Sequence, residues 1–172
     1  MPEFVEHTLK PIYNKQSNIL ILGTMPSPKS REFGFYYSHP QNRFWRVISQ
    51  LLEQSTPNTN EEKTTFLLKN HIALWDVLKS CEIEGADDSS IKSPVANDIA
   101  SLLHETNIKA IFTTGTKATA LYKRLCLPVT GIGSTYLPST SPANCRHYSY
   151  EKLIENYLVI LDYLRSNNHV GK

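Results

Sequence analysis

One stretch decides how this chain is organised, residues 23–45, which read GTMPSPKSREFGFYYSHPQNRFW. The five residues before it, NILIL, form a short apolar run that predicts a buried strand over residues 18–22. Apolar side chains then recur at helical spacing, which predicts a helix over residues 43–52. A long connection between a strand and a helix in a compact domain usually carries function. The alternative is a proline-stiffened surface loop whose aromatic residues only cap the core.

Outward from this stretch, apolar runs and helical patterns alternate along the chain. Further strands are predicted over residues 72–75, 108–112 and within 129–137, and further helices over residues 60–70, 94–104, 117–125 and from 149 onward. Thr59 and Glu62 have capping-box spacing at the first of these helices, and Ser93 before a proline is typical of a helix start. Residues 1–17 are expected to be a surface lead-in and residues 81–93 a polar loop. The alternation predicts an α/β fold, with a parallel sheet and helices on both faces.

Length and composition point to one ordinary globular domain over residues 1–172. Hydrophobic residues make up 40% and charged residues 20%, the net charge is +2 and the pI is about 8.4. Such a charge permits a nucleic-acid partner but does not demand one. Cys81, Cys126 and Cys145 are odd in number, widely spaced and free of CxxC spacing, so we expect reduced thiols in a cytoplasmic protein. No signal peptide or membrane-spanning run is expected.

Small or polar residues follow every predicted strand. They lie at residues 23–27, 76, 113–116 and 137–144. Ligands of open α/β sheets bind beyond the carboxyl ends of the strands, so this convergence predicts the position of the site. Dinucleotide, phosphate-loop and GxSxG motifs are missing from the sequence. The carboxylates lack metal-binding spacing, so no metal or cofactor is expected, and the acidic cluster at residues 82–88 is expected to be a solvated loop face.

Four segments together resemble one known family. They are GTMPS at residues 23–27, YYSHPQNRFW at 36–45, LWDVLKSCEIEGADDSSIK at 74–92 and LPSTSPAN at 137–144. They are similar to the uracil-DNA glycosylase superfamily, above all to its hypoxanthine-DNA glycosylase branch. The resemblance implies a three-layer α/β/α sandwich with a four-stranded parallel sheet. It also implies a monofunctional enzyme that excises a base from DNA without a metal.

The sequence departs from the uracil-specific branch at two catalytic positions. Met25 stands where that branch has an acid, and Leu137 stands where it has a histidine. The resemblance points instead to Asn42 as the catalytic residue. Its amide cannot act as a general base, but the carbonyl could orient a water and the NH₂ could donate a hydrogen bond. The alternative role for Asn42 is that of a helix N-cap.

A pocket for a flipped base is expected around the first two strand ends. The residues assigned to it are Gly23, Thr24, Met25, Tyr37, His39, Phe44 and Asp76. Tyr37 or Phe44 would stack on the base, with Tyr36 as another candidate, while Trp45 is expected to pack in the core. The Asp76 carboxylate could accept a hydrogen bond from a ring N–H next to a carbonyl, which hypoxanthine and uracil offer and adenine lacks. Asp76 as the cap of the following turn is the alternative.

A rigid loop after the last strand is expected to grip DNA. The residues assigned to DNA binding are Lys117, Ser139, Thr140, Ser141, Pro142, Asn144 and Arg146. The sequence thus predicts a monomeric DNA repair glycosylase acting on DNA with deaminated bases, namely hypoxanthine, with uracil or xanthine as further candidates. Two alternatives stay open: a non-catalytic nucleic-acid-binding module on the same fold, and an α/β enzyme acting on free nucleosides or nucleotides.

Overall fold

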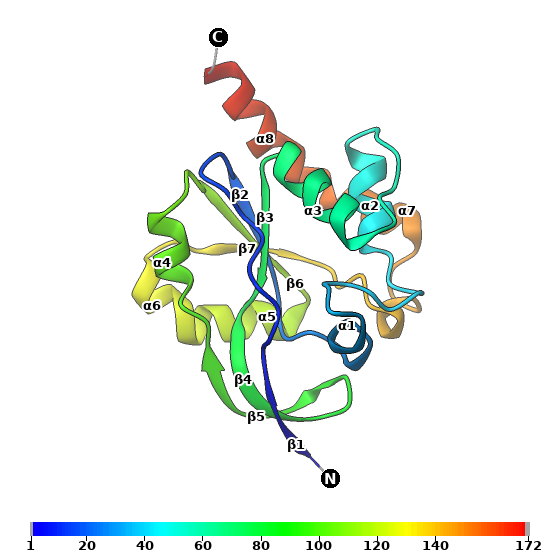
Figure 1. The fold of residues 1–172 in the computed structure, drawn as a ribbon, viewed down its shortest axis with the longest axis vertical. Coiled ribbons are helices and arrows are strands. Elements are labelled where there is room, and N and C mark those ends of the chain that lie inside the picture. The colour runs from blue at the N-terminus through cyan, green and yellow to red at the C-terminus, as the bar shows by residue number, and fades with distance from the viewer. Residues whose placement is uncertain (1, 171–172) are drawn as a thin grey trace.

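The fold is built on a four-stranded parallel sheet. A computed structural model describes residues 2–170 and orders the strands β3-β2-β6-β7 (Figure 1). Their bounds are β2 Ile19–Gly23, β3 Ile72–Asp76, β6 Ala110–Thr114 and β7 Ser134–Leu137. Neighbouring strands all run parallel, and β2 and β6 are buried along their whole length. Such burial requires continuous apolar runs, which is why these strands could be predicted from sequence.

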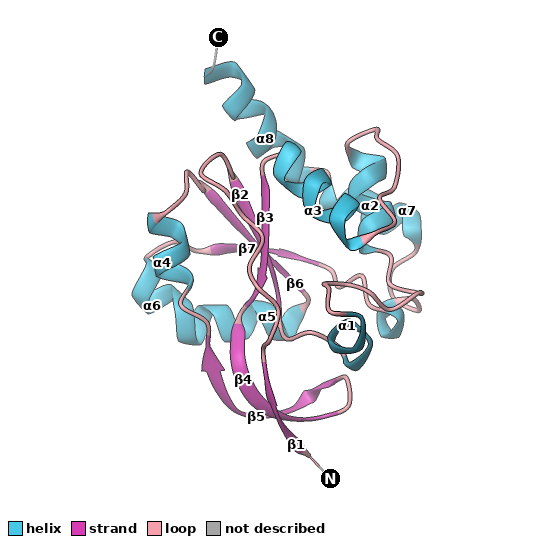
Figure 2. Ribbon diagram, viewed as in Figure 1, coloured by secondary structure: helices cyan, strands magenta, loops and turns pink. Residues whose placement is uncertain are grey.

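Helices cover both faces of this sheet, as Figure 2 shows. One face carries α2 Phe44–Leu51, α3 Asn60–Lys69, α7 Tyr150–Tyr157 and α8 Val159–Val170. The other carries α4 Ile99–His104, α5 Thr116–Leu121, a π-helical turn Tyr122–Cys126 and α6 Leu127–Thr130. Side chains of β2 alternate between the two cores, with Ile19 and Ile21 in the first and Leu20 and Leu22 in the second. The predicted three-layer α/β/α sandwich is confirmed.

Helix starts follow local capping chemistry. The capping box at α3 is present, since Thr59 accepts from the Glu62 backbone N–H and Glu62 accepts from the Thr59 N–H. Ser149 caps α7 by accepting a hydrogen bond from the Lys152 backbone N–H. The long stretch after β2 contains one unpredicted helix, α1 Pro28–Phe33, which Ser27 caps. Within residues 2–170, no helix combines the length and apolarity needed to cross a bilayer.

The polar segment 81–93 is a pair of strands, so its prediction as a loop was wrong. Strand β4 Leu78–Glu84 and strand β5 Asp87–Ala96 form an antiparallel hairpin with Gly85 in its turn at φ 55°. Cys81 and Ile83 are buried while Glu82 between them faces solvent, so the period of two was hidden by charged outward residues.

The predicted helix start at Ser93 was also wrong. Strand β5 is an edge strand, where a proline is tolerated, and Ser93 has a left-handed φ of 51° at an irregular part of the ladder. The helix starts later, with Asp98 accepting a hydrogen bond from the Ser101 backbone N–H.

The N-terminal segment is part of the fold rather than a surface lead-in. Strand β1 Glu3–Glu6 pairs antiparallel with β4, which completes a second sheet in the order β1-β4-β5. Val5 is buried against this sheet, and Ile12 bridges to Leu74 of β3. The strand was missed because only four residues form it and three of them are exposed. Because of this pairing, the next residue, His7, lies beside Asp76 at the carboxyl end of β3.

Candidate active site

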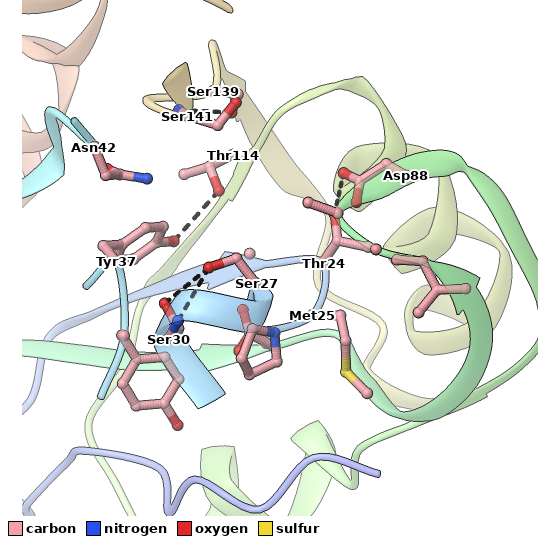
Figure 3. Close-up of a pocket in the computed structure, with 17 residues that line it drawn as sticks. Thr24, Met25, Ser27, Ser30, Tyr37, Asn42, Asp88, Thr114, Ser139 and Ser141 are labelled. Carbon is pink, nitrogen blue, oxygen red and sulfur yellow. Dashed lines mark hydrogen bonds between the residues drawn. The ribbon is translucent and has the colours of Figure 1, made fainter. Parts of the chain in front are cut away.

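A cavity of about 140 Å³ lies at the carboxyl ends of β2, β3 and β6 (Figure 3). This is smaller than the ~300–1,000 Å³ typical of pockets for drug-sized ligands. The predicted residues that line it are Gly23, Thr24, Met25, Tyr37, Asn42, Asp76, Ser139 and Ser141. Tyr36, the other stacking candidate, also lines it, as do Pro26, Ser27 and Thr114 of the predicted strand ends. The lining residues that sequence reasoning did not assign are Ser30, Ile83, Gly85, Ala86 and Asp88. The convergence of strand ends therefore does form a pocket.

Gly23 forms the floor of this pocket, where backbone and carboxylate approach closely. A Cβ atom at this position would lie 2.5 Å from Asp76 Oδ1 and 3.1 Å from the Tyr37 hydroxyl. Gly23 pairs directly with Asp76 across the parallel ladder, which explains the proximity. Any side chain at position 23 would displace the buried carboxylate, so this close approach requires glycine.

The Asp76 carboxylate is held from below by His7. His7 Nε2 lies 2.8 Å from Asp76 Oδ2, and the two side chains are 2% and 5% exposed. Because a carboxylate only accepts hydrogen bonds, the imidazole is the donor in this pair. The His7 ring also packs edge-on against Trp75 and beside Tyr36. Sequence reasoning missed His7 because its partner lies 69 residues away and no local motif marks it.

Tyr37 is the aromatic wall of the pocket. Its backbone has a φ of 52°, which is rare for a bulky residue and typical of constrained functional positions. The Tyr37 ring stacks on Phe44 with centroids 4.0 Å apart, and its hydroxyl lies 3.4 Å from Thr114 Oγ1. Burial, with a smaller contribution from Asp76, raises the pKa of Tyr37 well above its ordinary value, so the phenol stays neutral.

Phe44 is a correction to the predicted pocket. It is 0% exposed and lies behind Tyr37, so it supports the aromatic wall and cannot touch a base. His39 is placed outside the pocket lining as well, and its Nδ1 accepts from the Gln41 backbone N–H. Trp45 packs in the core as predicted. The aromatic block therefore places Tyr36 and Tyr37 at the pocket, while Phe44 and Trp45 pack behind them.

The amide of Asn42 has a fixed orientation. Its Oδ1 accepts hydrogen bonds from the Phe44 backbone N–H at 2.9 Å and from Thr140 Oγ1 at 2.8 Å. The backbone N–H can only donate, so it identifies Oδ1 and excludes the flipped amide. Figure 3 shows the NH₂ end directed toward Tyr37 and Thr114. Asn42 is not the N-cap of α2, which is Arg43, but lies one residue before it and still accepts from the first helical N–H. This hydrogen bond and the pocket role coexist, because they use opposite ends of one amide.

Thr140 supports Asn42 instead of contacting DNA, which corrects its predicted role. It is 1% exposed, its hydroxyl donates to Asn42, and its carbonyl accepts from the Arg43 backbone N–H at 3.2 Å. Tyr157 donates to the Pro138 carbonyl at 2.6 Å and fixes the start of the same loop. The loop after β7 is thus tied to the segment before α2 that contains the candidate catalytic residue.

Asp88 also lies at the pocket, so the expectation of a solvated acidic face was wrong for this residue. The hairpin turn brings its Oδ2 within 3.3 Å of Thr24 Oγ1, which donates to it. Burial of the carboxyl raises the pKa of Asp88, Thr24 and Lys117 oppose this, and Asp76 and Asp87 add to it. The clue in the sequence was the alternation of apolar and charged residues over residues 81–84, before Gly85.

A larger groove of about 680 Å³ adjoins the pocket. It runs between the tip of the β4–β5 hairpin, the start of α5 and the loop after β7. The predicted DNA-contact residues that line it are Lys117, Ser139, Ser141 and Asn144. Pro142 opens the 3₁₀ turn Pro142–Asn144 beside it, and Arg146 is exposed two residues beyond that turn. Within residues 2–170, no cluster of three or more His, Cys, Asp or Glu residues has metal-site geometry.

The fold and this site define an α/β/α protein with a small polar pocket that opens on a groove at the sheet's carboxyl edge. The chain belongs to the uracil DNA glycosylase superfamily, whose family model matches residues 10–165. Two similar proteins carry the name Hypoxanthine DNA glycosylase. One, from Methanosarcina barkeri, is 32% identical over 83% of this chain and 90% of its own length. The other, from Methanosarcina acetivorans, is 36% identical over 78% of this chain and 85% of its own length.

A solved structure shows the same fold. The solution NMR structure of a candidate uracil DNA glycosylase from Methanosarcina acetivorans has a TM-score of 0.80 and 30% sequence identity. The match covers 95% of this chain and 99% of that one. Family membership and the named relatives identify this chain as an enzyme of the DNA glycosylase class, a hydrolase of N-glycosyl bonds.

Proposed function

We propose that this enzyme excises hypoxanthine from DNA by hydrolysing the N-glycosidic bond of deoxyinosine. The observation that carries the proposal is the Asp76 carboxylate, fixed by His7 and exposed to the pocket at the floor beside Gly23. The names of the two curated relatives support the same substrate. Uracil and xanthine also present a ring N–H beside a carbonyl, so they are secondary substrates to be tested.

Base selection rests on the unused oxygen of Asp76. His7 occupies Oδ2, which leaves Oδ1 to accept from the N1–H of a flipped hypoxanthine. Adenine has a lone pair at N1, so an acceptor would face an acceptor inside a buried pocket. Sites built on such a buried hydrogen bond reject the wrong partner strongly, because desolvated groups are left unpaired.

Tyr37 supplies the stacking surface for the flipped base. Its ring stacks on Phe44 and its hydroxyl contacts Thr114, so the side chain is already ordered. Little conformational entropy is therefore lost when a base stacks on it. Stacking of a base on an aromatic ring contributes roughly 1–3 kcal/mol and is tolerant of base identity. In this proposal Asp76 determines which base is accepted, and Tyr37 holds the base by stacking.

Asn42 acts as a hydrogen-bond donor. Cleavage of the glycosidic bond moves negative charge onto the departing base, and a preorganised N–H stabilises such charge. Both lone-pair sites of Asn42 Oδ1 are occupied by Phe44 and Thr140, so the end available to the reaction is the NH₂. The alternative in which the carbonyl orients a water would require one of these hydrogen bonds to break.

A duplex with one deoxyinosine tests the function. Incubation with the enzyme followed by alkali should cut the strand at that position, and free hypoxanthine should appear in solution. Parallel duplexes with uracil, xanthine and adenine rank the bases. Binding without release of a base would support the non-catalytic alternative. Turnover of free nucleosides with no action on the duplex would support the nucleotide-enzyme alternative and contradict the proposal.

A further inference from the structure

The pocket and the groove share a narrow set of residues. Ala86, Asp88, Ser139 and Ser141 line both cavities, so they mark the passage between them. If the base of a nucleotide fills the pocket and its backbone follows the groove, its C1′ atom, which joins base and sugar, lies in this passage. This step rests on the proposed function, since it assumes a flipped base in the pocket.

Among those four residues, Asp88 alone is ionisable. One of its oxygens accepts from Thr24 Oγ1, and the other is not used by that hydrogen bond. Four other charged or titratable groups interact with it electrostatically. They are Lys117 of α5, Asp76 of β3, and Asp87 and Cys81 of the hairpin. The local field thus combines one cation with two further carboxylates.

We propose that Asp88 is a catalytic residue, the general base that orients and deprotonates the water attacking C1′. The water oxygen forms a bond to C1′ while the bond from C1′ to the base nitrogen breaks, and its electron pair leaves with the base. The Asp88 carboxylate takes the proton from the water. The resulting carboxylic acid then returns a proton to the departed base, so the products are neutral hypoxanthine and a sugar hydroxyl.

The other polar residues of the pocket cannot take this proton. Asn42 has an amide, which is not a base, and the Tyr37 phenol is neutral. Asp76 is buried at the floor with His7 bound to it, below the base rather than beside the sugar. Burial also raises the pKa of Asp88, and proton transfer is more effective when the pKa of a base approaches the working pH.

The test compares Asp88→Asn with Glu82→Gln, a matched control that removes one charge from an exposed position of the same hairpin. Single-turnover release of hypoxanthine should fall by roughly 10²–10⁴-fold in Asp88→Asn and stay near wild type in Glu82→Gln. Asparagine can still accept from Thr24, so affinity for the inosine duplex and the thermal unfolding midpoint should be kept. Release within a few-fold of wild type in Asp88→Asn would overturn the proposal.

A pH profile separates catalysis from a structural role. Release should rise with pH as Asp88 ionises, and this limb should be missing in Asp88→Asn. Thr24→Val removes the hydrogen bond that lowers the pKa of Asp88, so its rising limb should move to higher pH. A rising limb that is unchanged in both variants would refute the assignment. If Asp88→Asn does not fold, Thr24→Val still tests the assignment, because its rising limb must move to higher pH.

Failure of this proposal and failure of the proposed function give different results. If the wild-type enzyme releases hypoxanthine and Asp88→Asn does so equally fast, only the role of Asp88 is lost. If the wild-type enzyme releases no hypoxanthine from the duplex, both are overturned together.

Discussion

At the scale of single residues, substitutions of Asn42 can tell whether its NH₂ donor or its oxygen acceptor serves the reaction. Asn42→Ala should slow single-turnover release of hypoxanthine by roughly 10²–10³-fold, as expected for the loss of one preorganised donor. Asn42→Asp keeps the oxygen that Phe44 and Thr140 require but loses the N–H, so it should be similarly slow. Quench-flow measurement on the inosine duplex gives both rates. Near-normal release by Asn42→Asp would show that the oxygen, not the NH₂, carries the function.

The hydrogen bond between His7 and Asp76 leads to a second prediction, which concerns the choice of base. His7→Ala leaves a buried carboxylate without its donor, and we expect the preference for deoxyinosine over deoxyadenosine to fall by at least about tenfold.

Asp76→Asn should alter which base is released while affinity for undamaged DNA is unchanged, because an amide can donate as well as accept. Competition between labelled duplexes measures the preference.

An exposed histidine provides the control for this experiment. His104→Ala changes the same residue type at the end of α4, away from the pocket, and should keep the wild-type preference. If His7→Ala weakens DNA binding uniformly and leaves base preference intact, the pair has a purely structural role.

At the scale of elements, the loop after β7 joins two tasks. Its buried side holds Asn42 through Thr140, and its outer side lines the groove through Ser139, Ser141 and Asn144. A shift of this loop on DNA would therefore reach the amide of Asn42 directly. Arg146 lies on the exposed continuation of the loop, where contacts to phosphates would position DNA without reading bases.

Arg146→Ala should weaken binding about equally on inosine-containing and undamaged duplexes. The slope of log affinity against log salt should become shallower by about one unit, because one phosphate contact no longer releases a counterion. Lys123→Ala, on an exposed turn outside the groove, is the charge-matched control. Binding titrations at four salt concentrations measure the slopes, and a loss of affinity confined to the inosine duplex would place Arg146 in base reading instead.

At the scale of the whole molecule, the parallel sheet and its helices could be predicted because each carries a local signal. Continuous apolar runs mark β2, β3 and β6, and capping residues mark α3 and α7. The pocket residues at the carboxyl ends of these strands, such as Gly23 and Asp76, could be predicted for the same reason.

The rest of the site depends on pairing between distant segments. His7 reaches Asp76 only because β1 pairs with β4, and Asp88 reaches Thr24 only because β4 and β5 form a hairpin. Short edge strands with one polar face have weak sequence signals, so neither segment can be assigned from the sequence alone.

Removal of residues 1–8 tests whether the second sheet serves the pocket. Without β1 the parallel sheet keeps both of its helical layers, so a folded protein with native helix content by circular dichroism is expected. Its thermal midpoint should drop, since Val5 no longer covers β4, and its base preference should fall to that of His7→Ala. Wild-type preference in the shortened chain would contradict a role for this strand in base selection.

The hydrogen bond between Thr140 and Asn42 has a consequence for synthesis on the ribosome. The two residues are 98 positions apart, so the amide cannot be oriented until residue 140 has left the exit tunnel. His7 likewise waits for Asp76, which is made 69 residues later. A nascent or prematurely terminated chain therefore holds its key residues without the geometry that joins them. We therefore expect such fragments to be inactive on DNA, so that base-removing activity arises only from chains that are almost complete.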